Sequence, residues 1–281
     1  MAIISPQMEF PIDETHNRLR YISKFTNFFM SEALKIQSDV KIQSLVSDHE
    51  EKERMKQAEY RMEKVIIDTI QKEFPQDSIL SEEAGFSEGK GNFLWVIDPI
   101  DGSMNFVRGI PLFSISIGIE HRETPVAGFV LLPALHTVYS AIYGEGAFKN
   151  NNRILVSKTE ELQHSLIVSS FPTNRKDILS ELMSEITAFI ASGRSIRRTG
   201  SLVLDICWIA EGVLDGLWEK GIKVWDSSAA SVILKEAGGQ ITGFTGDRFL
   251  RGQSDIVCSN GIIHSQIIEI LKKVKSGYSL N

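Results

Sequence analysis

The sequence predicts an α+β protein in which long helices pack on sheets built largely from antiparallel hairpins. Two observations support this fold class. Apolar residues recur at helical spacing over residues 14–36 and 50–74, which is typical of amphipathic helices. After Pro75 the pattern changes to short apolar runs separated by turn residues, which is typical of strands that follow one another in a sheet.

The two N-terminal helices each present one apolar face. The apolar residues of the first fall near a single face: Leu19, Ile22, Phe25, Phe29 and Leu34. In the second, Val65, Ile66 and Ile70 form the stripe, and Pro75 ends the helix. The charged residues 47–54 match neither pattern, so we expect a mobile or solvated helical stretch there.

The following elements are read from short apolar runs and their bounding turns. Strands are expected at 93–98, 113–120, 126–132 and 137–143, with turns at 144–146 and 149–152. Residues 114–120 alternate strictly, so one face should be covered while the other is small and polar. Later elements are a strand at 165–169, helices at 176–192, 201–211 and 226–236, a strand at 255–259 and a helix at 262–274. The pair Gly238-Gly239 ends the third of these helices as a C-cap.

Length and composition are those of a globular enzyme. The 281 residues can bury a sizeable core, and we expect a single domain over 1–281. With 30 basic and 36 acidic residues, the formal charge of −6 provides no electrostatic footprint for nucleic acid or an anionic membrane. Cys207 and Cys258 lie in apolar segments without metal-ligand spacing, which indicates buried thiols in a cytoplasmic protein. No signal peptide or membrane-spanning run is recognised.

The most informative segment is Asp98-Pro-Ile-Asp101-Gly102-Ser103, which ends the apolar run 93–97 with two carboxylates. Burying an unpaired carboxylate is costly, so a cation is expected where this strand ends. Gly102-Ser103 could open a helix whose free N–H groups face the same place. A divalent metal beside a phosphate suits this arrangement, and an ordinary Asp-Gly turn remains an alternative at this point.

Two further acidic sites end predicted elements. Glu82-Glu83 follows the apolar run Ile79-Leu80, and Asp226 precedes an alanine-rich helix. Taken singly, each has an ordinary explanation: Glu82-Glu83 as a solvated loop pair, and Asp226 as a helix N-cap. Three acidic sites in the same kind of position favour a shared function.

These segments resemble the inositol monophosphatase family, the lithium-sensitive, magnesium-dependent sugar-phosphate phosphatases, with the bacterial inositol-1-monophosphatases as the most similar branch. The resemblance runs from about Ala58 to Asn260. The matching motifs are Glu82-Glu83, the run from Trp95 to Phe106, Arg198-Thr-Gly-Ser201, Asp215-Gly-Leu-Trp-Glu219, Trp225-Asp226, Ala229-Ala230 and Glu236-Ala-Gly-Gly239.

The resemblance implies a fold and a division of labour along the chain. The fold would be a five-layered αβαβα sandwich of the inositol monophosphatase and fructose-1,6-bisphosphatase type. Residues of about 1–160 would supply the metal and phosphate half of the site, and about 161–281 the substrate half. A homodimer is also implied.

The resemblance further implies two Mg²⁺ ions and their ligands. Glu82, Asp98 and the carbonyl of Ile100 would hold the first, while Asp98, Asp101 and Asp226 would hold the second. Two metals can neutralise phosphate oxygens, activate water and stabilise a leaving alkoxide. Glu82 and the Ser103 hydroxyl would orient the attacking water. The N–H groups of Gly102 and Ser103 would bind the phosphate, and Asp226 would lie near the leaving oxygen.

Two positions depart from the family pattern. Ser103 replaces the usual threonine and keeps its hydroxyl. The family carries Val-Thr-x-x-Asp before the first metal ligand, whereas this chain has Met55-Lys-Gln-Ala-Glu59 there. Since that acid supports a third, weak metal site, we expect the third site and the lithium response to be weakened.

Substrate recognition rests on positions in the C-terminal half. Glu219 stands where the family has a hydroxyl-binding glutamate, which would select a polyol. Lys223 and Leu202 replace a histidine and an alanine of the animal enzymes. They could reshape the pocket, although Lys223 could equally extend into solvent. Arg197-Arg198 could meet a second phosphate or lie at a surface or subunit interface.

The sequence therefore predicts a magnesium-dependent phosphomonoesterase that hydrolyses inositol-1-phosphate. Alternative substrates are fructose-1,6-bisphosphate, 3′-phosphoadenosine-5′-phosphate or another nucleotide phosphate, and histidinol phosphate. A weakly active scaffold or regulatory homologue is the alternative from another class. Four retained carboxylates argue against it, because they repel one another without a metal.

Overall fold

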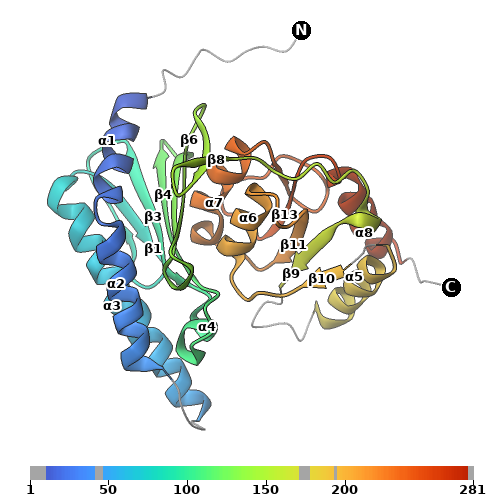
Figure 1. Ribbon diagram of the computed structural model, residues 1–281, viewed down its shortest axis with the longest axis horizontal. Coiled ribbons are helices and arrows are strands. Elements are labelled where there is room, and N and C mark those ends of the chain that lie inside the picture. The colour runs from blue at the N-terminus through green and yellow to red at the C-terminus, as the bar shows by residue number, and fades with distance from the viewer. Residues whose placement is uncertain (1–10, 42–46, 171–177, 193–194, 278–281) are drawn as a thin grey trace.

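The computed structural model describes residues 11–41, 47–170, 178–192 and 195–277, and Figure 1 shows five layers of helix and sheet. The outer helical layer at the left of the figure contains α1 (Ile12–Ser23), α2 (Thr26–Val40) and α3 (Asp48–Glu73). The predicted helix 14–36 is therefore two helices. Their junction lies at Lys24 and Phe25, where Phe25 leaves the helical conformation with φ −97° and ψ 6°.

The charged stretch before the second predicted helix is ordered as the first turns of α3. The Ser47 hydroxyl accepts the Glu50 N–H and caps the helix. Glu51 is buried and pairs with Arg108 through two hydrogen bonds of 2.6 and 2.8 Å. The expectation of a solvated segment was wrong at Glu51, because this bidentate pair ties α3 to the short helix α4 (Ser103–Arg108).

An eight-stranded sheet forms the second layer, in the order β2-β1-β3-β4-β5-β6-β7-β8. Its strands are β1 (Ser78–Ser81), β2 (Gly85–Ser87), β3 (Phe93–Asp101), β4 (Ser114–His121), β5 (Thr124–Leu132), β6 (Thr137–Ile142), β7 (Gly146–Lys149) and β8 (Asn152–Ile154). The expected hairpins from β3 to β6 are confirmed as antiparallel pairs. The segments read as turns at 144–146 and 149–152 bound two further short strands, β7 and β8, which the sequence pattern did not predict.

The central layer is formed by α6 (Leu202–Ala210) and α7 (Val224–Glu236), which lie between the two sheets. Gly118 and Gly128 are opposite one another on β4 and β5. A Cβ at Gly118 would lie 2.4 Å from Ser228 Oγ, and one at Gly128 would lie 2.2 Å from the Ala229 carbonyl oxygen. Only glycine lets α7 approach the sheet this closely, and this approach brings the start of α7 to the end of β3.

A five-stranded sheet and two helices complete the fold. The sheet order is β10-β9-β11-β13-β12, and its strands are β9 (Leu166–Ser169), β10 (Ser195–Arg197), β11 (Gly216–Lys220), β12 (Gln240–Thr242) and β13 (Asp255–Ser259). Helices α5 (Leu179–Ser192) and α8 (His264–Lys275) cover its outer face around buried Phe189 and Ile267. The predicted α+β, five-layered αβαβα architecture is confirmed. The start of the predicted helix 176–192 lies partly outside the described residues.

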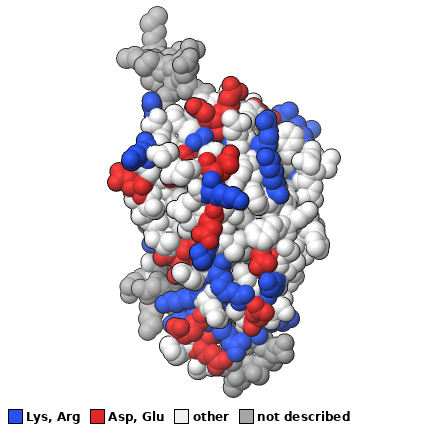
Figure 2. Space-filling view, turned by 90° about the vertical axis from the view of Figure 1, so that its left-hand side faces the viewer, with Lys and Arg blue, Asp and Glu red and all other residues white. Residues whose placement is uncertain are grey.

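The outer face formed by α1 to α3 carries interspersed charge, as Figure 2 shows. Several of these charges are paired: Arg54 with Glu50, Arg61 with Asp39 and Lys64 with Asp68, at 2.8 to 2.9 Å. Such exposed pairs contribute little to stability, but they leave this face without a field of one sign. Among the described residues, no helix is both long and apolar enough to cross a bilayer.

Candidate active site

The segment Asp98–Asp101 closes β3 at an irregularity of the sheet. The pairing of β3 with β4 shifts register between Asp98 and Asp101, and such bulges re-aim side chains. The Ile100 N–H donates to Asp98 Oδ1 at 3.1 Å. Asp98 itself is almost fully buried, so its carboxylate is held inside the protein at the end of an apolar strand.

Asp101 is held by the start of α6. Its Oδ2 accepts hydrogen bonds from the hydroxyls of Ser114 and Ser201 and from the Val203 N–H. Among the described residues, Oδ1 accepts one hydrogen bond, from the Leu202 N–H at 3.2 Å. A carboxylate oxygen has two lone-pair sites, so Oδ1 retains one for another ligand. Leu202 therefore contributes its backbone N–H to the position of Asp101.

Glu82 is positioned by a residue that sequence reasoning missed. Glu63 on α3 is buried, and its Oε1 accepts the Ser81 hydroxyl and the N–H groups of Glu83 and Ala84, the latter two at 3.1 Å. These bonds clamp the turn after β1 on both sides of Glu82. An acid at position 63, three and seven residues before Ile66 and Ile70 of the predicted buried stripe, was the signal available in the sequence.

Asp226 occupies the third position of α7 rather than the N-cap, which is Lys223. Its Oδ2 accepts the Lys223 N–H at 2.7 Å, and Oδ1 has no hydrogen-bond partner within the described residues. The predicted N-cap position of Asp226 was wrong by three residues, because the helix begins earlier, at Val224. The capping interpretation and the ligand interpretation are compatible, because one oxygen serves each purpose.

Glu59 joins this cluster from α3. It is buried, and its carboxylate accepts a hydrogen bond from the Ser103 hydroxyl. Burial, with the neighbouring charges of Glu83 and Glu63, raises the pKa of Glu59 to about 7. The sequence around residue 59 departs from the family pattern, but it still places an acid at the site. Glu59 lies on the regular helix α3, and its carboxylate contacts the Ser103 hydroxyl.

Burial raises the pKa of Glu59, Glu82, Asp98, Asp101 and Asp226, and repulsion by neighbouring acids adds to it in all of them except Asp101. The pKa of Glu82 rises to about 8, mainly through burial and then the charges of Glu59 and Asp226. The pKa of Asp226 rises to about 7 through burial and the charge of Asp101. Burial and the Glu82, Asp101 and Asp226 charges raise the pKa of Asp98 well above its usual range. Groups that act on one another in this way lie close together, and strongly perturbed carboxyls mark functional sites.

The cluster fits a hard cation such as Mg²⁺. Its side-chain donors are carboxylate and hydroxyl oxygens, which Mg²⁺ prefers. Ser116 lies opposite Asp98 in the ladder, and its buried hydroxyl has no hydrogen-bond partner within the part of the chain that the structure describes. Over the described part of the chain, no group of three or more His, Cys, Asp or Glu side chains is arranged to hold a metal ion as it stands.

Gly102 and Ser103 lie beside the carboxylates. Gly102 has φ +89°, and a Cβ there would lie 3.1 to 3.3 Å from Leu112, Gly200 and Ser201. Only glycine suits this left-handed, crowded position. The turn brings Ser103 to the first position of α4, where its backbone N–H has no partner in the helix.

Comparison with known proteins now identifies the family. The model of the inositol monophosphatase family matches residues 24–276. The fructose-1,6-bisphosphatase/inositol-1-monophosphatase of Aquifex aeolicus is 38% identical over 230 residues, covering 81% of this chain and 85% of that protein. Nus factor SuhB of Haemophilus influenzae is 35% identical over 212 residues, covering 75% and 78%. The chain belongs to the inositol monophosphatase family.

The fold comparison agrees with this membership. The structure of inositol monophosphatase from Anabaena superposes with a TM-score of 0.77 at 30% identity, and the match covers 92% of this chain and 99% of that one. The family is one of phosphatases, and the chain is a member of it.

In this family member, Glu219 is carried toward the acidic cluster by β11. Burial, followed by the charges of Asp205 and Asp101, raises the pKa of Glu219 well above its ordinary value, and Ser170 donates a hydrogen bond to it. A protonated or hydroxyl-bonded carboxyl is therefore favoured at this position. Glu219 lies in the C-terminal half, across the site from Asp98.

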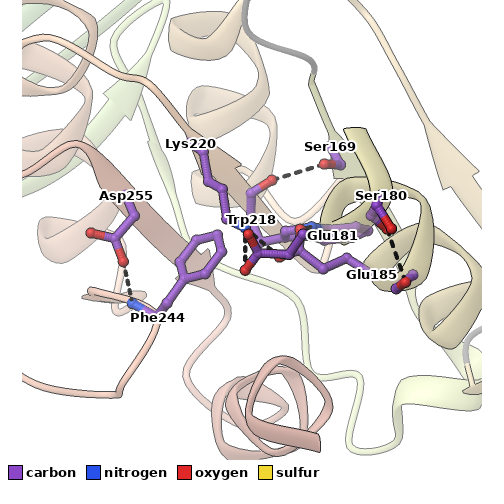
Figure 3. A network of polar contacts seen from close by, with 9 residues as sticks. Ser169, Ser180, Glu181, Glu185, Trp218, Lys220, Phe244 and Asp255 are labelled. Atoms are coloured by element: carbon purple, nitrogen blue, oxygen red, sulfur yellow. Dashed lines mark hydrogen bonds and ion pairs between the residues drawn. The ribbon is translucent and has the colours of Figure 1, made fainter. Parts of the chain in front are cut away.

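The neighbours of Glu219 on β11 anchor the strand to α5, as Figure 3 shows. Trp218 Nε1 donates to Glu185 at 3.1 Å, and Lys220 pairs with Glu185 at 2.6 Å and with Glu181 at 2.9 Å. The Trp218 ring also stacks on Phe189 with centroids 3.8 Å apart. Residues on both sides of Glu219 are thus fixed, which restricts where its side chain can point.

The remaining candidates lie at the edges of the site. Lys223 is the exposed N-cap of α7. Arg197 ends β10, is exposed, and donates to its own neighbour Ser195. The Arg197 contact stays within β10. Lys223 adjoins the carboxylate cluster, because its N–H donates to Asp226 and its positive charge partly offsets the rise in the pKa of Asp226.

Proposed function

We propose that this protein is a magnesium-dependent phosphomonoesterase whose principal substrate is inositol-1-phosphate, which it hydrolyses to inositol and phosphate. The observation that carries this proposal is the cluster of Glu82, Asp98, Asp101 and Asp226: burial raises the pKa of all four, and the charges of the others raise it further for Glu82, Asp98 and Asp226. Such a cluster is costly unless a cation occupies it. Membership in a phosphatase family supplies the reaction class.

Two Mg²⁺ ions would be held by these residues. Glu82, Asp98 and the carbonyl oxygen of Ile100 would bind one, and Asp98, Asp101 and Asp226 the other. Bound Mg²⁺ would supply Lewis acidity toward the phosphate oxygens and an activated water. Glu59 makes a third, weaker Mg²⁺ site compatible with this chain, because its carboxylate lies within the electrostatic reach of Glu82.

The chain's own groups would bind the ester and handle the proton. The N–H groups of Gly102 and Ser103 would bind the phosphate. The Ser103 hydroxyl, hydrogen-bonded to Glu59, and Glu82 would orient the water that attacks phosphorus. As the new P–O bond forms, the water proton passes toward Glu59. The bond from phosphorus to the ester oxygen breaks, and the leaving alkoxide, near Asp226, takes a proton from solvent.

Glu219 would select a polyol by accepting hydrogen bonds from its hydroxyls, while Leu202 and Lys223 shape the pocket. Fructose-1,6-bisphosphate is the strongest alternative substrate, since the Aquifex relative is named for both activities. Arg197 and Arg198 would then meet the second phosphate. 3′-Phosphoadenosine-5′-phosphate and histidinol phosphate are further alternatives. We also propose a cytoplasmic location.

A homodimer is part of the proposal. Leu179, Met183 and Ile190 form an apolar stripe on α5 and are 47, 52 and 65% exposed. Apolar groups on one helix face favour contact with another protein surface. The variant Met183→Glu should shift the protein toward monomer in sedimentation velocity, whereas an unchanged sedimentation coefficient would exclude this face from a dimer.

A regulatory role is the second candidate function, because several relatives are named Nus factor SuhB. A regulatory role would not require hydrolysis of a phosphate ester. Variants of the metal ligands therefore test the phosphatase activity, and variants of the protein surface test the regulatory role.

The deciding experiment measures phosphate release with and without Mg²⁺ from four substrates: inositol-1-phosphate, fructose-1,6-bisphosphate, histidinol phosphate and 3′-phosphoadenosine-5′-phosphate. We expect Mg²⁺-dependent release with inositol-1-phosphate preferred. A preference for another ester would correct the substrate. No release from any of them by folded protein would overturn the phosphatase proposal and favour the regulatory one.

A further inference from the structure

A cavity lies outside the carboxylate cluster. Its volume is about 460 Å³, within the range of small-molecule sites. It is bounded by the β4–β5 hairpin, one side of α7 and the loop around residues 248–252. The residues that line it include none of Glu82, Asp98, Asp101, Glu219 and Asp226.

The walls of this cavity are largely apolar. Val126 and Pro125 come from the hairpin, Val224 and Val232 from α7, and Phe249 and Leu250 from the loop. Leu250 is 62% exposed, so an apolar group at the cavity edge is in contact with water. Burying it against a ligand body would be favourable.

Most of the acids at the cavity are already engaged. Glu120 is fully buried and accepts from Arg251 and from the Ser228 hydroxyl, each at 2.8 Å. Both oxygens of Glu236 accept backbone N–H groups, those of Gly144 at 2.9 Å and Gly146 at 2.8 Å. Glu123, at the hairpin, lies near Glu120.

Two cations at the cavity are not engaged. Lys235 on α7 and Arg248 on the loop both line it, and within the described residues neither forms an ion pair or a side-chain hydrogen bond. Burial and the like charge of Arg248 lower the pKa of Lys235. Lys235 and Arg248 both line the cavity and are exposed at its apolar wall, so a bound anion could pair with both.

We propose that this cavity is a second ligand site, which binds a small organic anion whose charged group lies between Lys235 and Arg248 and whose apolar body lies against Val232, Phe249 and Leu250. The two cations favour a ligand with a negative charge, and the apolar walls favour a ligand with an apolar body. A bare inorganic anion would leave the apolar walls wet, and a neutral apolar molecule would leave the two cations unpaired.

The test uses a matched pair of fluorescent probes that are not phosphate esters. 8-Anilinonaphthalene-1-sulfonate carries the negative charge, and N-phenyl-1-naphthylamine has the same apolar body without it. Titrations are made with saturating Mg²⁺ and inorganic phosphate, which occupy the active site. Wild-type protein should bind one equivalent of the sulfonate, and more tightly than the neutral amine.

The variant Lys235→Gln with Arg248→Gln should bind the sulfonate at least tenfold more weakly and the neutral amine unchanged. The control Lys272→Gln with Lys275→Gln removes the same charge from the exposed end of α8 and should bind as wild type. If the double variant is less stable, Arg248→Gln alone replaces it, because Arg248 is at an exposed loop position. This single variant should also bind the sulfonate more weakly than wild type.

A steric variant distinguishes the cavity from other apolar surface. Thr124→Trp, at an exposed position of the hairpin that lines the cavity, should weaken binding of both probes. Equal sulfonate affinity in wild type and the charge variant would overturn the proposal.

Discussion

Asp226 combines two roles in one carboxylate. Its Oδ2 accepts the Lys223 N–H and stabilises the start of α7, while Oδ1 is left for another partner. Because asparagine keeps an oxygen acceptor for the N–H but loses the negative charge, Asp226→Asn separates the two roles.

We expect Asp226→Asn to fold normally and to lower kcat/KM at least a hundredfold, which is about 3 kcal/mol of transition-state stabilisation. The measurement is steady-state phosphate release, with thermal unfolding to confirm the fold. Asp247→Asn is the matched control, because Asp247 is exposed and its side chain accepts a hydrogen bond from the Thr245 hydroxyl at 2.7 Å. Wild-type turnover in Asp226→Asn would remove this carboxylate from the mechanism.

Glu59 is the second residue whose role can be isolated. Its hydrogen bond from Ser103 joins the helix layer to the catalytic turn. We expect Glu59→Gln to lower kcat by about tenfold to a hundredfold, because a neutral amide orients a water but cannot accept its proton. Glu83→Gln, an exposed neighbour, should leave kcat unchanged. Equal kcat values for the two variants would assign Glu59 a purely structural role.

At the scale of elements, α3 links the outer layer to the site. One face of this helix carries Glu51, Glu59 and Glu63, which reach α4, Ser103 and the turn after β1. The position of Glu82 therefore depends on how α3 packs against the sheet. A buried acid that binds three donors costs stability when it is removed, because those donors lose their partner.

The variant Glu63→Ala should lower the free energy of unfolding by about 1–3 kcal/mol and raise the Mg²⁺ concentration needed for half-maximal activity. Glu73→Ala, exposed on the last turn of the same helix, should change neither. The two measurements are thermal unfolding and Mg²⁺ titration of activity. Lower stability with an unchanged Mg²⁺ requirement would show that Glu63 supports the fold without positioning Glu82.

At the scale of the whole molecule, the carboxylate cluster couples stability to pH and metal. The pKa values of Glu59 and Asp226 rise to about 7 and that of Glu82 to about 8 in the folded protein. These three carboxyls therefore hold more protons in the folded state than in the unfolded state between about pH 4 and 8. Their contribution to stability falls as pH rises through this window, and it outnumbers the opposite contribution of His264, whose pKa burial lowers to about 4.

We expect the Tm of protein kept in a metal chelator to fall by at least about 4 °C between pH 5.5 and 8.5, a change of roughly 1–2 kcal/mol for a protein of this size. Added Mg²⁺ should raise Tm more at pH 8.5 than at pH 5.5, because it binds the deprotonated carboxylates. Differential scanning calorimetry at constant ionic strength makes this comparison. A Tm that rises with pH in the chelator would show that the carboxyls are not raised in pKa.

Local patterns in the sequence were sufficient for the strongly periodic elements and for the acids that end them. Three local patterns each indicate a buried segment: the apolar run before Asp98, the alternation in β4 and the small residues of α7. The Asp98–Ser103 motif and Glu82 could be recognised because their residue types and spacing are unusual after a buried strand. The five-layered fold followed from the resemblance that these motifs carry.

Contacts between distant segments decided the rest. Strands β2, β7, β8, β10 and β12 have only three or four residues each, so their neighbours in the sheet, and no local pattern, make them strands. Glu59 and Glu63 reach Ser103 and the turn after β1 only because α3 packs against β3. The cavity between the hairpin, α7 and the 248–252 loop joins residues more than a hundred positions apart. Burial and charge at such places depend on the packed chain, because the partners of each group are brought together only by folding.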